Sequence, residues 1–434
     1  MVSLGFAAVV LSAAVSAAEW PQFRGPQGDG HADVSSLPTT WNETEHVKWK
    51  AALPGRGWSS PVIGNGLIWV TTAIEHPAGE IAKAKAQLKL IGNPMAKEMS
   101  FVGSITLRAV AVDVVTGAIK HDVELFHVKD PAPVHSLNSY ASPSPILVDH
   151  RLLCHFGDYG TACVNTADGK ILWKARLNVD HSVGPGSSPI IYEDLLIVPC
   201  DGADQQFVAA LNIDDGAEAW KTPRPKMTGF VGDLHKAFST PTLATINGQP
   251  QAIVVGAQWV VGYEPRTGKE LWRMRHGEGF SNVPRPLIGN GFIYICTGFM
   301  KPALLAIRDD VQGEVTLDKV AWSVTKQVPA MPSPILVGKE VYFVSDAGIA
   351  TCVDALNGET LWQQRIEGNY SASPLFADGK LYFTNREGRT TVLKPGREFE
   401  TLAVNQLDGQ WLASPAAIDG ALFLRSATHL YRIG

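Results

Sequence analysis

The chain lacks the patterns that usually identify metal, haem and nucleic-acid proteins. It contains no CxxC, CxxCH or HExxH motif, so the common zinc and haem signatures are missing. Its net charge is -5 with no block of basic residues, which argues against nucleic-acid binding. After residue 18 no apolar run approaches the roughly 18 residues that a membrane-spanning helix requires. The sequence therefore favours a globular protein outside these classes.

Residues 1–18 differ in composition from the rest of the chain. They are small and apolar, and the run ends in Val15-Ser16-Ala17-Ala18 before Glu19. This pattern predicts a signal peptide over 1–18, although its first residues carry no Lys or Arg. No cysteine lies near the expected cleavage point, which disfavours a lipid anchor. We therefore expect a periplasmic or secreted protein with one domain over 19–434.

The five cysteines do not have the spacing of a disulfide scaffold. Cys154, Cys200 and Cys296 end apolar runs, where a buried thiol serves as a small hydrophobic side chain. Cys154 and Cys163 flank a predicted hairpin turn at 158–160 and are placed to face each other. Export permits a disulfide there, and the sequence leaves open whether the two are bonded.

The chain is dominated by an internal repeat that opens on a proline. Each unit passes through a short apolar stretch and an Asn-Gly, Asp-Gly or related turn into a strand of β-branched and aromatic residues, as at 61–70 and 374–383. Eight units begin at Pro61, Pro145, Pro189, Pro241, Pro286, Pro334, Pro374 and Pro415. From Pro145 onward the spacings are 44, 52, 45, 48, 40 and 41 residues. Such periods are typical of propellers and other repeat arrays.

Each unit has a second half that predicts two more strands. Residues 352–362 match 163–173 and 262–272, and in each a turn glycine precedes a tryptophan by four residues. Proline is tolerated at the first position of a strand, and Asn-Gly or Asp-Gly turns supply the positive φ of tight hairpins. Four short strands per unit predict an all-β, eight-bladed propeller, with seven blades as the alternative count.

The two ends of the chain are expected to complete one blade between them. The last unit, 415–433, has three strand runs and no closing tryptophan segment. Residues 46–50 precede the first unit and have the pattern of an outer strand. The sequence therefore predicts that this N-terminal strand closes the ring and leaves no open sheet edge.

At this point the chain resembles a known family. The repeat is similar to the PQQ-like repeat of bacterial quinoprotein dehydrogenases and of the outer-membrane assembly lipoprotein BamB. The opening at 19–26, EWPQFRGP, and the ending at 429–434, HLYRIG, resemble one secreted bacterial subfamily of these repeat proteins. The resemblance covers nearly all of 19–434 and implies the propeller fold. It does not imply one activity, because the repeat residues are structural.

The closing tryptophans are expected to pack between blades rather than to bind a cofactor, because their spacing is locked to the repeat. They are Trp49, Trp173, Trp220, Trp272, Trp322 and Trp362. Two blades depart from this pattern, with His121 and Glu400 at the aligned position.

One face of the predicted ring carries loops that differ between blades. They precede each innermost strand or join the two middle strands, and their side chains are expected to converge around a channel mouth. The candidate partner- or ligand-binding residues are Trp58, His135, Tyr140, His181, His235, Phe238, Trp259, Phe280, Tyr370 and Trp411, beside Asn282 and Met300. Trp259 and Trp411 are the predicted anchors, because aromatic side chains dominate interface energies. The alternative is a rim without a ligand, whose rings pack within their own loops.

Metal binding has weaker support. His135, His181 and His235 precede strands at similar offsets, so a three-histidine site is conceivable. Lone loop histidines are more often solvated, and no metal site is predicted. Carboxylates near the middle-strand turns are interpreted as turn formers rather than calcium ligands: Asp158, Asp201, Asp204, Asp346 and Glu387.

An insertion in the first blade, about 73–106, interrupts the β pattern. Ile81, Ala84, Leu88 and Ile91 recur at helical spacing, and lysines make the segment basic, namely Lys83, Lys85, Lys89 and Lys97. A short helix lying over the chain's own propeller is the favoured interpretation. Docking on a membrane surface is the alternative.

Two functions remain from different classes. The favoured one is a non-enzymatic binding or scaffold module of the cell envelope, acting as a monomer without a cofactor on an unidentified protein, peptide or glycan. The alternative is a PQQ-dependent quinoprotein oxidoreductase supported by calcium. The resemblance implies that such an enzyme has an adjacent Cys-Cys disulfide, calcium ligands and a catalytic Asp in recognisable motifs. No Cys-Cys pair occurs in this sequence, and no residue is singled out as a catalytic base.

Overall fold

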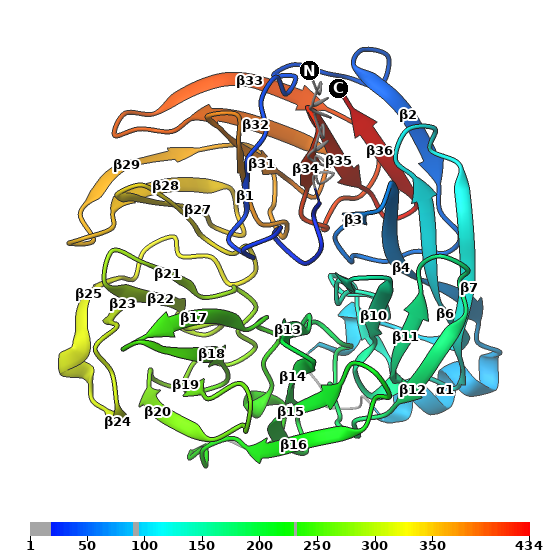
Figure 1. Ribbon diagram of the computed structural model, residues 1–434, viewed down its shortest axis with the longest axis horizontal. Coiled ribbons are helices and arrows are strands. Elements are labelled where there is room, and N and C mark those ends of the chain that lie inside the picture. Colours follow the sequence, from blue (N-terminus) through cyan, green and yellow to red (C-terminus); the bar gives the residue numbers. More distant parts are fainter. Residues whose placement is uncertain (1–18, 90–94, 230–231) are drawn as a thin grey trace, which may run out of the picture.

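Eight antiparallel sheets stand around a central axis, like blades of a propeller (Figure 1). The computed structural model describes residues 19–89, 95–229 and 232–434, so the predicted signal peptide at 1–18 lies outside the described residues. Each sheet has four principal strands, and two sheets carry a fifth. The predicted all-β, eight-bladed propeller is confirmed, and the alternative of seven blades is wrong.

The innermost strands are short and each follows one of the repeat prolines. In order from blade 1 to blade 8 they are β3 (Val62–Gly64), β9 (Ile146–Val148), β13 (Ile190–Tyr192), β17 (Thr242–Ile246), β21 (Leu287–Gly289), β26 (Ile335–Val337), β30 (Leu375–Ala377) and β34 (Ala416–Ile418). The second strands are β4 (Leu67–Pro77), β10 (Arg151–His155), β14 (Leu195–Asp201), β18 (Gln249–Val255), β22 (Phe292–Cys296), β27 (Glu340–Val344), β31 (Lys380–Thr384) and β35 (Ala421–Arg425).

The third and fourth strands complete each blade toward the outside. The third strands are β6 (Val102–Asp113), β11 (Thr161–Asn165), β15 (Gln206–Asn212), β19 (Trp259–Tyr263), β23 (Leu304–Arg308), β28 (Ile349–Asp354), β32 (Arg389–Lys394) and β36 (His429–Ile433). The fourth strands are β7 (Ile119–Lys129), β12 (Ile171–Ala175), β16 (Glu218–Pro223), β20 (Glu270–Arg275), β25 (Val320–Val324), β29 (Thr360–Arg365), β33 (Glu400–Gln406) and β2 (Val47–Ala52).

The remaining elements are short. They are the strands β1 (His31–Ala32), β5 (Met99–Ser100), β8 (Val134–His135) and β24 (Gly313–Val315), the helix α1 (Glu80–Lys89), and the 3-10 turns η1 (Ala96–Glu98), η2 (Gly157–Tyr159), η3 (Gly232–His235) and η4 (Leu317–Lys319).

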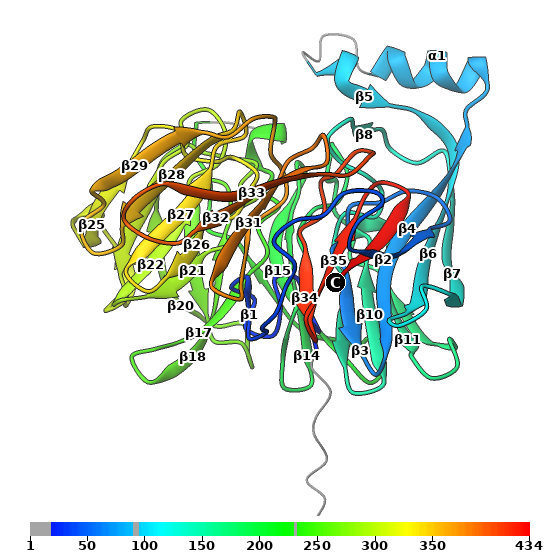
Figure 2. The same cartoon turned by 90° about the horizontal axis from the view of Figure 1, so that it is seen from above.

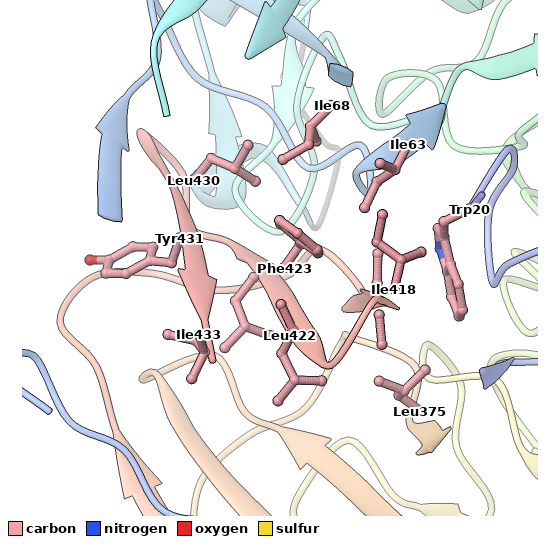
Figure 3. Close-up of a cluster of buried hydrophobic side chains, with 14 of the residues drawn as sticks. Trp20, Ile63, Ile68, Leu375, Ile418, Leu422, Phe423, Leu430, Tyr431 and Ile433 are labelled. Atoms are coloured by element: carbon pink, nitrogen blue, oxygen red, sulfur yellow. The ribbon is translucent and has the colours of Figure 1, made fainter. Parts of the chain in front are cut away.

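The hydrophobic core is a ring of clusters between neighbouring blades. The second and third strands are buried along nearly their whole length, because both faces of each sheet are covered by other blades. The fourth strands alternate between covered and exposed residues, as in β16. One cluster joins blades 7, 8 and 1, and it includes Trp20, Ile68, Phe423 and Leu375 (Figure 3). The core therefore depends on every blade having two neighbours.

Tryptophans of the outer strands form hydrogen bonds from five of the blades to the blade that follows. Five indole N–H groups donate to a carbonyl in a turn of the following blade at 2.8 to 3.2 Å, those of Trp49, Trp173, Trp220, Trp322 and Trp362. The Trp173 ring lies so close over Gly216 that a Cβ there would be 2.5 Å from it. The turn has a φ of 75° at Gly216, which also favours glycine. The prediction that these rings pack between blades is confirmed.

Three blades depart from this arrangement. Trp272 donates instead to Gln251 Oε1 of its own blade at 2.7 Å. In blade 1 the aligned residue His121 stacks on Trp69 with ring centroids 5.6 Å apart. In blade 7 the prediction of Glu400 at this position is wrong. The strand register places Ala403 there, opposite Val392 and beside the same β-bulge that other blades have.

The ring is closed by the predicted N-terminal strand. β2 pairs antiparallel with β36, with Val47 opposite Ile433 and Trp49 opposite Arg432. Glu43 strengthens the junction, because it accepts a hydrogen bond from the Tyr431 hydroxyl at 3.2 Å and pairs with Lys50 at 3.0 Å. Blade 8 is thus built from both ends of the described chain.

Residues 20–32 cross the end of the central channel that lies opposite α1 (Figures 1 and 2). Trp20 pairs with Ile63 of blade 1, and β1 pairs with β30 of blade 7. Between them, the Arg24 guanidinium donates to the carbonyls of Ser333 and Pro334 in blade 6. These contacts with blades 1, 6 and 7 hold the segment across this end of the channel.

The cysteines are all free and buried. Cys163 lies opposite Leu153 in blade 2, whereas Cys154 lies opposite Ala162. Successive residues of a strand point to opposite faces, so the two thiols lie on different sides of the sheet. Cys154 packs between blades 1 and 2, and Cys163 packs between blades 2 and 3. The possible disulfide between them is therefore not formed.

Three histidines are buried within the propeller. Burial lowers the pKa of His155 to about 3 and the pKa values of His181 and His276 to about 4. The folded state therefore favours the neutral imidazoles, since a charged ring would be desolvated without compensation.

Replacing Trp49 by alanine is expected to weaken ring closure. The half-buried ring and its hydrogen bond to Val114 would be lost, at a cost of about 2 kcal/mol in the free energy of unfolding. Equilibrium unfolding in urea measures the change. Lys48→Ala, on the exposed side of the same strand, is the matched control and should change stability by less than about 0.5 kcal/mol. Equal stability of the two variants would contradict a closure that depends on Trp49.

The protein should lose stability in mild acid because of its buried histidines. Their folded pKa values lie below the usual value near 6.5, so the stabilisation is complete above about pH 6.5 and is lost as pH falls toward 4. For His181 the loss is on the order of 3 kcal/mol. Urea unfolding at several pH values should show a shallower pH dependence in His181→Gln than in the wild type. An unchanged slope in this variant and in His276→Gln would refute the assignment.

Candidate functional site

The central channel holds a cavity of about 580 Å³ on the face opposite the crossing segment. Its walls come from the loops before the innermost strands and the loops between the second and third strands. The residues lining it are Phe23, Trp58, Ser60, Met95, His135, Leu137, Asn138, Ser142, Ser144, Val183, Gly186, Ser188, Lys236, Phe238, Thr240, Phe280, Ser281, Val283, Phe299, Met300, Met331, Ser333, Asp346, Ser371, Ser373, Arg386, Leu412 and Ser414. The predicted irregular face therefore does surround a hollow.

A ring of hydroxyl groups lines the cavity. In seven blades the residue before the repeat proline is Ser or Thr. The side-chain oxygen of each accepts a hydrogen bond from the backbone N–H of the corresponding residue in the preceding blade. These links run from Ser60 to Ser144, Ser144 to Ser188, Ser188 to Thr240, Arg285 to Ser333, Ser333 to Ser373, Ser373 to Ser414 and Ser414 to Ser60, at 2.8 to 3.1 Å. The ring thus fastens the inner edges of the blades and presents hydroxyls to the channel.

Blade 5 interrupts this ring with an arginine. The buried Arg285 side chain turns toward the closed end of the channel, where it donates to the carbonyl of Phe23 at 2.8 Å and to Thr242 Oγ1 at 3.1 Å. Burial, and to a smaller extent the neighbouring Arg24, lowers the pKa of Arg285 to about 9. Phe23 itself lines the cavity. Arg285 therefore helps to hold the segment that forms this end of the cavity.

The walls above the hydroxyl ring are mainly aromatic and sulfur-containing. Phe280 and Phe299 are held side by side by a backbone bridge, with the Phe299 N–H donating to the Phe280 carbonyl at 2.9 Å. Phe299 is 40% exposed and Met300 is 77% exposed, so this part of the rim faces solvent. Met331 and Met95 add flexible side chains. Such methionine-rich surfaces adapt to ligands of different shape.

Four ionisable groups reach the cavity, namely Lys236, His135, Asp346 and Arg386. Burial lowers the pKa values of Lys236, His135 and Arg386 and raises the pKa of Asp346. The charges of Lys236 and Arg386 lower the pKa of His135 further, which favours its neutral form. The charged groups are therefore two cations and one carboxylate.

The carboxylate and the guanidinium already have partners in their own loops. Asp346 Oδ2 accepts the N–H of Ala330 at 2.8 Å. Arg386 donates from Nε to Ser371 Oγ at 2.8 Å and from Nη2 to the Tyr370 carbonyl at 3.1 Å. These bonds hold both side chains against the wall and leave Lys236 as the more available cation.

Of the ten predicted site residues, four line the cavity: Trp58, His135, Phe238 and Phe280. They lie in loops before the innermost strands of different blades, as the sequence pattern indicated. Their joint position supports this face as a binding surface, which remains a prediction.

The other six do not line it. Tyr140, Tyr370 and Trp411 are fully buried, and Trp411 packs on Tyr431 with ring centroids 5.1 Å apart. Trp259 donates its indole N–H to the Lys226 carbonyl at 3.2 Å. The choice of Trp411 as a partner anchor is corrected by its burial, and Trp259 lies outside the cavity. These rings pack against other parts of the chain itself, as the alternative interpretation expected.

His181 and His235 are also outside the cavity lining. His181 is buried, and neither ring nitrogen has a hydrogen-bond partner. Among the described residues, no three His, Cys, Asp or Glu side chains are close enough to hold a metal ion. His135, His181 and His235 thus do not converge. Of the carboxylates, Asp201 pairs with the buried Arg224 at 3.2 Å.

The insertion rises from blade 1 on the cavity side (Figure 2). β4 and β6 extend beyond the blade, and α1 joins them with Ile81 77% exposed and Leu88 65% exposed. The expectation of a helix lying over the propeller is therefore wrong for α1. The segment after it does contact the mouth, because Met99 packs with Val183 and Phe238. In the described parts of the chain no helix has the length and apolarity to cross a membrane.

Several cavity residues carry no signal in the sequence that predicts their position. The hydroxyl ring was visible as the Ser or Thr before seven of the repeat prolines, but it had no assigned role. Lys236, Arg386 and Met331 had no pattern that separates them from other loop residues. Their position became clear only once distant blades were brought together.

The chain is similar in sequence to two outer membrane protein assembly factors, and it is similar in fold to an assembly factor and to a dehydrogenase. Outer membrane protein assembly factor BamB of Moranella endobia is 23% identical over 240 residues, covering 55% of this chain and 58% of that protein. BamB of Yersinia pestis is 23% identical over 277 residues, covering 60% of this chain and 66% of that protein. The chain thus matches about three-fifths of the length of these relatives.

Two solved structures share the fold. BamB from Moraxella catarrhalis superposes with a TM-score of 0.54 at 13% identity, covering 77% of this chain and all of the other. A europium-containing methanol dehydrogenase superposes with a TM-score of 0.63 at 10% identity, covering 95% of this chain and 90% of the other. At these identities the likeness concerns the fold alone.

The family is shown by the repeats themselves. The family model described as outer membrane protein assembly factor BamB matches residues 87–256 and 256–412. These matches cover well over half of the chain and include most of the blades. The protein therefore belongs to the family of PQQ-like β-propellers that this model describes.

Proposed function

We propose that the protein is a non-enzymatic binding module of the cell envelope, which binds a partner protein through the face that carries the cavity. The observation that carries this proposal is the cavity itself, with aromatic and methionine walls and a solvent-facing rim at Phe299 and Met300. Exposed apolar side chains of this kind mark binding sites on soluble proteins. Membership of a family described as an assembly factor supports a binding role.

The envelope location rests on separate support. The pattern at 1–18 is typical of an export signal, and the relatives are described as acting in outer membrane protein assembly. We propose a periplasmic or secreted location on this basis.

A PQQ-dependent oxidoreductase is the alternative, because a methanol dehydrogenase shares the fold. Calcium takes six to eight oxygen ligands, usually with several carboxylates. Asp346 is the one carboxylate among the residues lining this cavity, and its Oδ2 is bonded to Ala330. The five cysteines also include no adjacent pair. The residues present therefore do not fit a calcium-supported quinone.

The purified protein is expected to take up no PQQ tightly. Incubation with PQQ and calcium, followed by gel filtration, would show whether the quinone absorbance elutes with the protein. We expect the absorbance to elute with the free quinone, because the cavity lacks the ligand set for the metal. Co-elution at one equivalent per protein would favour the oxidoreductase.

A photoreactive benzoylphenylalanine at Met300 is expected to capture a partner in cells. Met300 is exposed at the rim, so the substitution should leave the fold intact. Val115 is the matched control, since it is 67% exposed in a turn between β6 and β7 on the opposite face. After irradiation, adducts of defined mass should form at Met300 and be absent at Val115. Adducts at Val115 alone would move the binding surface to the other face.

A further inference from the structure

Lys236 belongs to the residues that line the cavity, and its buried ammonium has no hydrogen-bond partner within the described part of the chain. Its side chain is 3% exposed. Its Nζ forms one ion pair, with Asp233 Oδ1 at 3.6 Å, and this distance is too long for a hydrogen bond. A buried ammonium costs free energy unless it is paired and hydrogen-bonded. Because Lys236 also lines the cavity, a bound anion is the partner that the protein itself does not provide.

The hydroxyl ring adds neutral donors to the same cavity. Each of its seven oxygens accepts a backbone N–H from another blade, and none of these hydroxyls donates to an atom of residues 19–89, 95–229 or 232–434. A hydroxyl carries one hydrogen of its own to donate. These hydrogens are therefore left for a polar group that enters the channel.

Beyond these polar groups the cavity has several large apolar side chains, and Phe23 lies at the end where residues 20–32 cross the channel. Phe23 and the segment around it block the far end, so a ligand that enters from the rim must terminate inside. Trp58, Phe238 and Phe280 supply apolar walls between the rim and the polar groups. This shape suits a molecule with an apolar body and a polar group at its end.

The other charged groups favour a single negative charge on that end. Asp346 Oδ1 has no hydrogen-bond partner and would repel a dianion, whereas Arg386 is already bonded to Ser371 and Tyr370. Of the two cations, Lys236 therefore has the less compensated charge. A carboxylate carries one charge and accepts several hydrogen bonds, which matches one ammonium beside several hydroxyls.

We propose that the channel cavity is a binding site for an apolar monocarboxylate, such as a fatty acid, whose carboxylate pairs with the buried Lys236 ammonium and accepts hydrogen bonds from the hydroxyl ring. The inference rests on the proposed binding role of this face and names a ligand class for it. It concerns a small molecule in the cavity, whereas the partner protein is expected at the rim.

Calorimetric titration of the whole mature protein with dodecanoate, below its micelle concentration, tests the site. Dodecanoate should bind at one equivalent and at least tenfold more tightly than dodecan-1-ol, which has the same apolar body without the charge. This comparison uses the wild-type protein and so does not depend on any variant. Absence of dodecanoate binding, or equal affinity for the alcohol, would overturn the proposal.

Lys236→Met tests the role of the ammonium. Methionine keeps an unbranched apolar side chain, and removal of an incompletely paired buried charge should leave the melting temperature unchanged or higher. The variant should lose most of the preference for dodecanoate over the alcohol. Lys339→Met, at an exposed position on the opposite face, should keep it. A folded Lys236→Met that retains the full preference would refute the assignment of Lys236.

The two proposals fail in different ways. Loss of adducts at Met300 with dodecanoate binding intact would refute the partner surface alone. Adducts at Met300 without dodecanoate binding would refute the ligand site alone.

Discussion

Face-to-face packing of the blades is the constraint on which the rest of this structure depends. The middle strands of each sheet are buried on both sides, and an end blade would expose one apolar face to water. A row of such sheets has no stable end, so it closes into a ring. The tryptophan contacts and the serine hydroxyls hold the same interfaces at their outer and inner edges. The channel, and the cavity within it, follow from that closure.

The sequence predicted the fold well because the fold is periodic. Every blade repeats the proline, and most blades repeat the turn glycine and the tryptophan, so the same pattern recurs many times within a single chain. The partner of β36 was also predictable, since Trp49 belongs to the same pattern as the other closing tryptophans. Glu400 was misplaced because blade 7 has no tryptophan to mark the register.

The site was predictable only in outline. Loop position alone does not determine whether a side chain faces the axis or its own blade. Trp58 reaches the cavity, whereas Trp411 packs on Tyr431, and that difference depends on residues far away in the sequence. Lys236 shows the same limit. Its burial arises from several blades together, and nothing in its immediate sequence separates it from an exposed lysine.

Closure of the ring by β2 and β36 has a consequence for biosynthesis. The strand that completes blade 8 is made before the other principal strands of every blade, yet its partner β36 follows all of them in the sequence. Until β36 has been made, β2 lacks its sheet and blade 1 lacks one neighbour, so the ring cannot close. Contacts between residues so distant in sequence also form slowly. A chain that stops early keeps an unpaired strand and an uncovered apolar face, which are features that proteases and chaperones recognise. The pairing of β2 with β36 therefore makes native structure conditional on a chain that extends through β36.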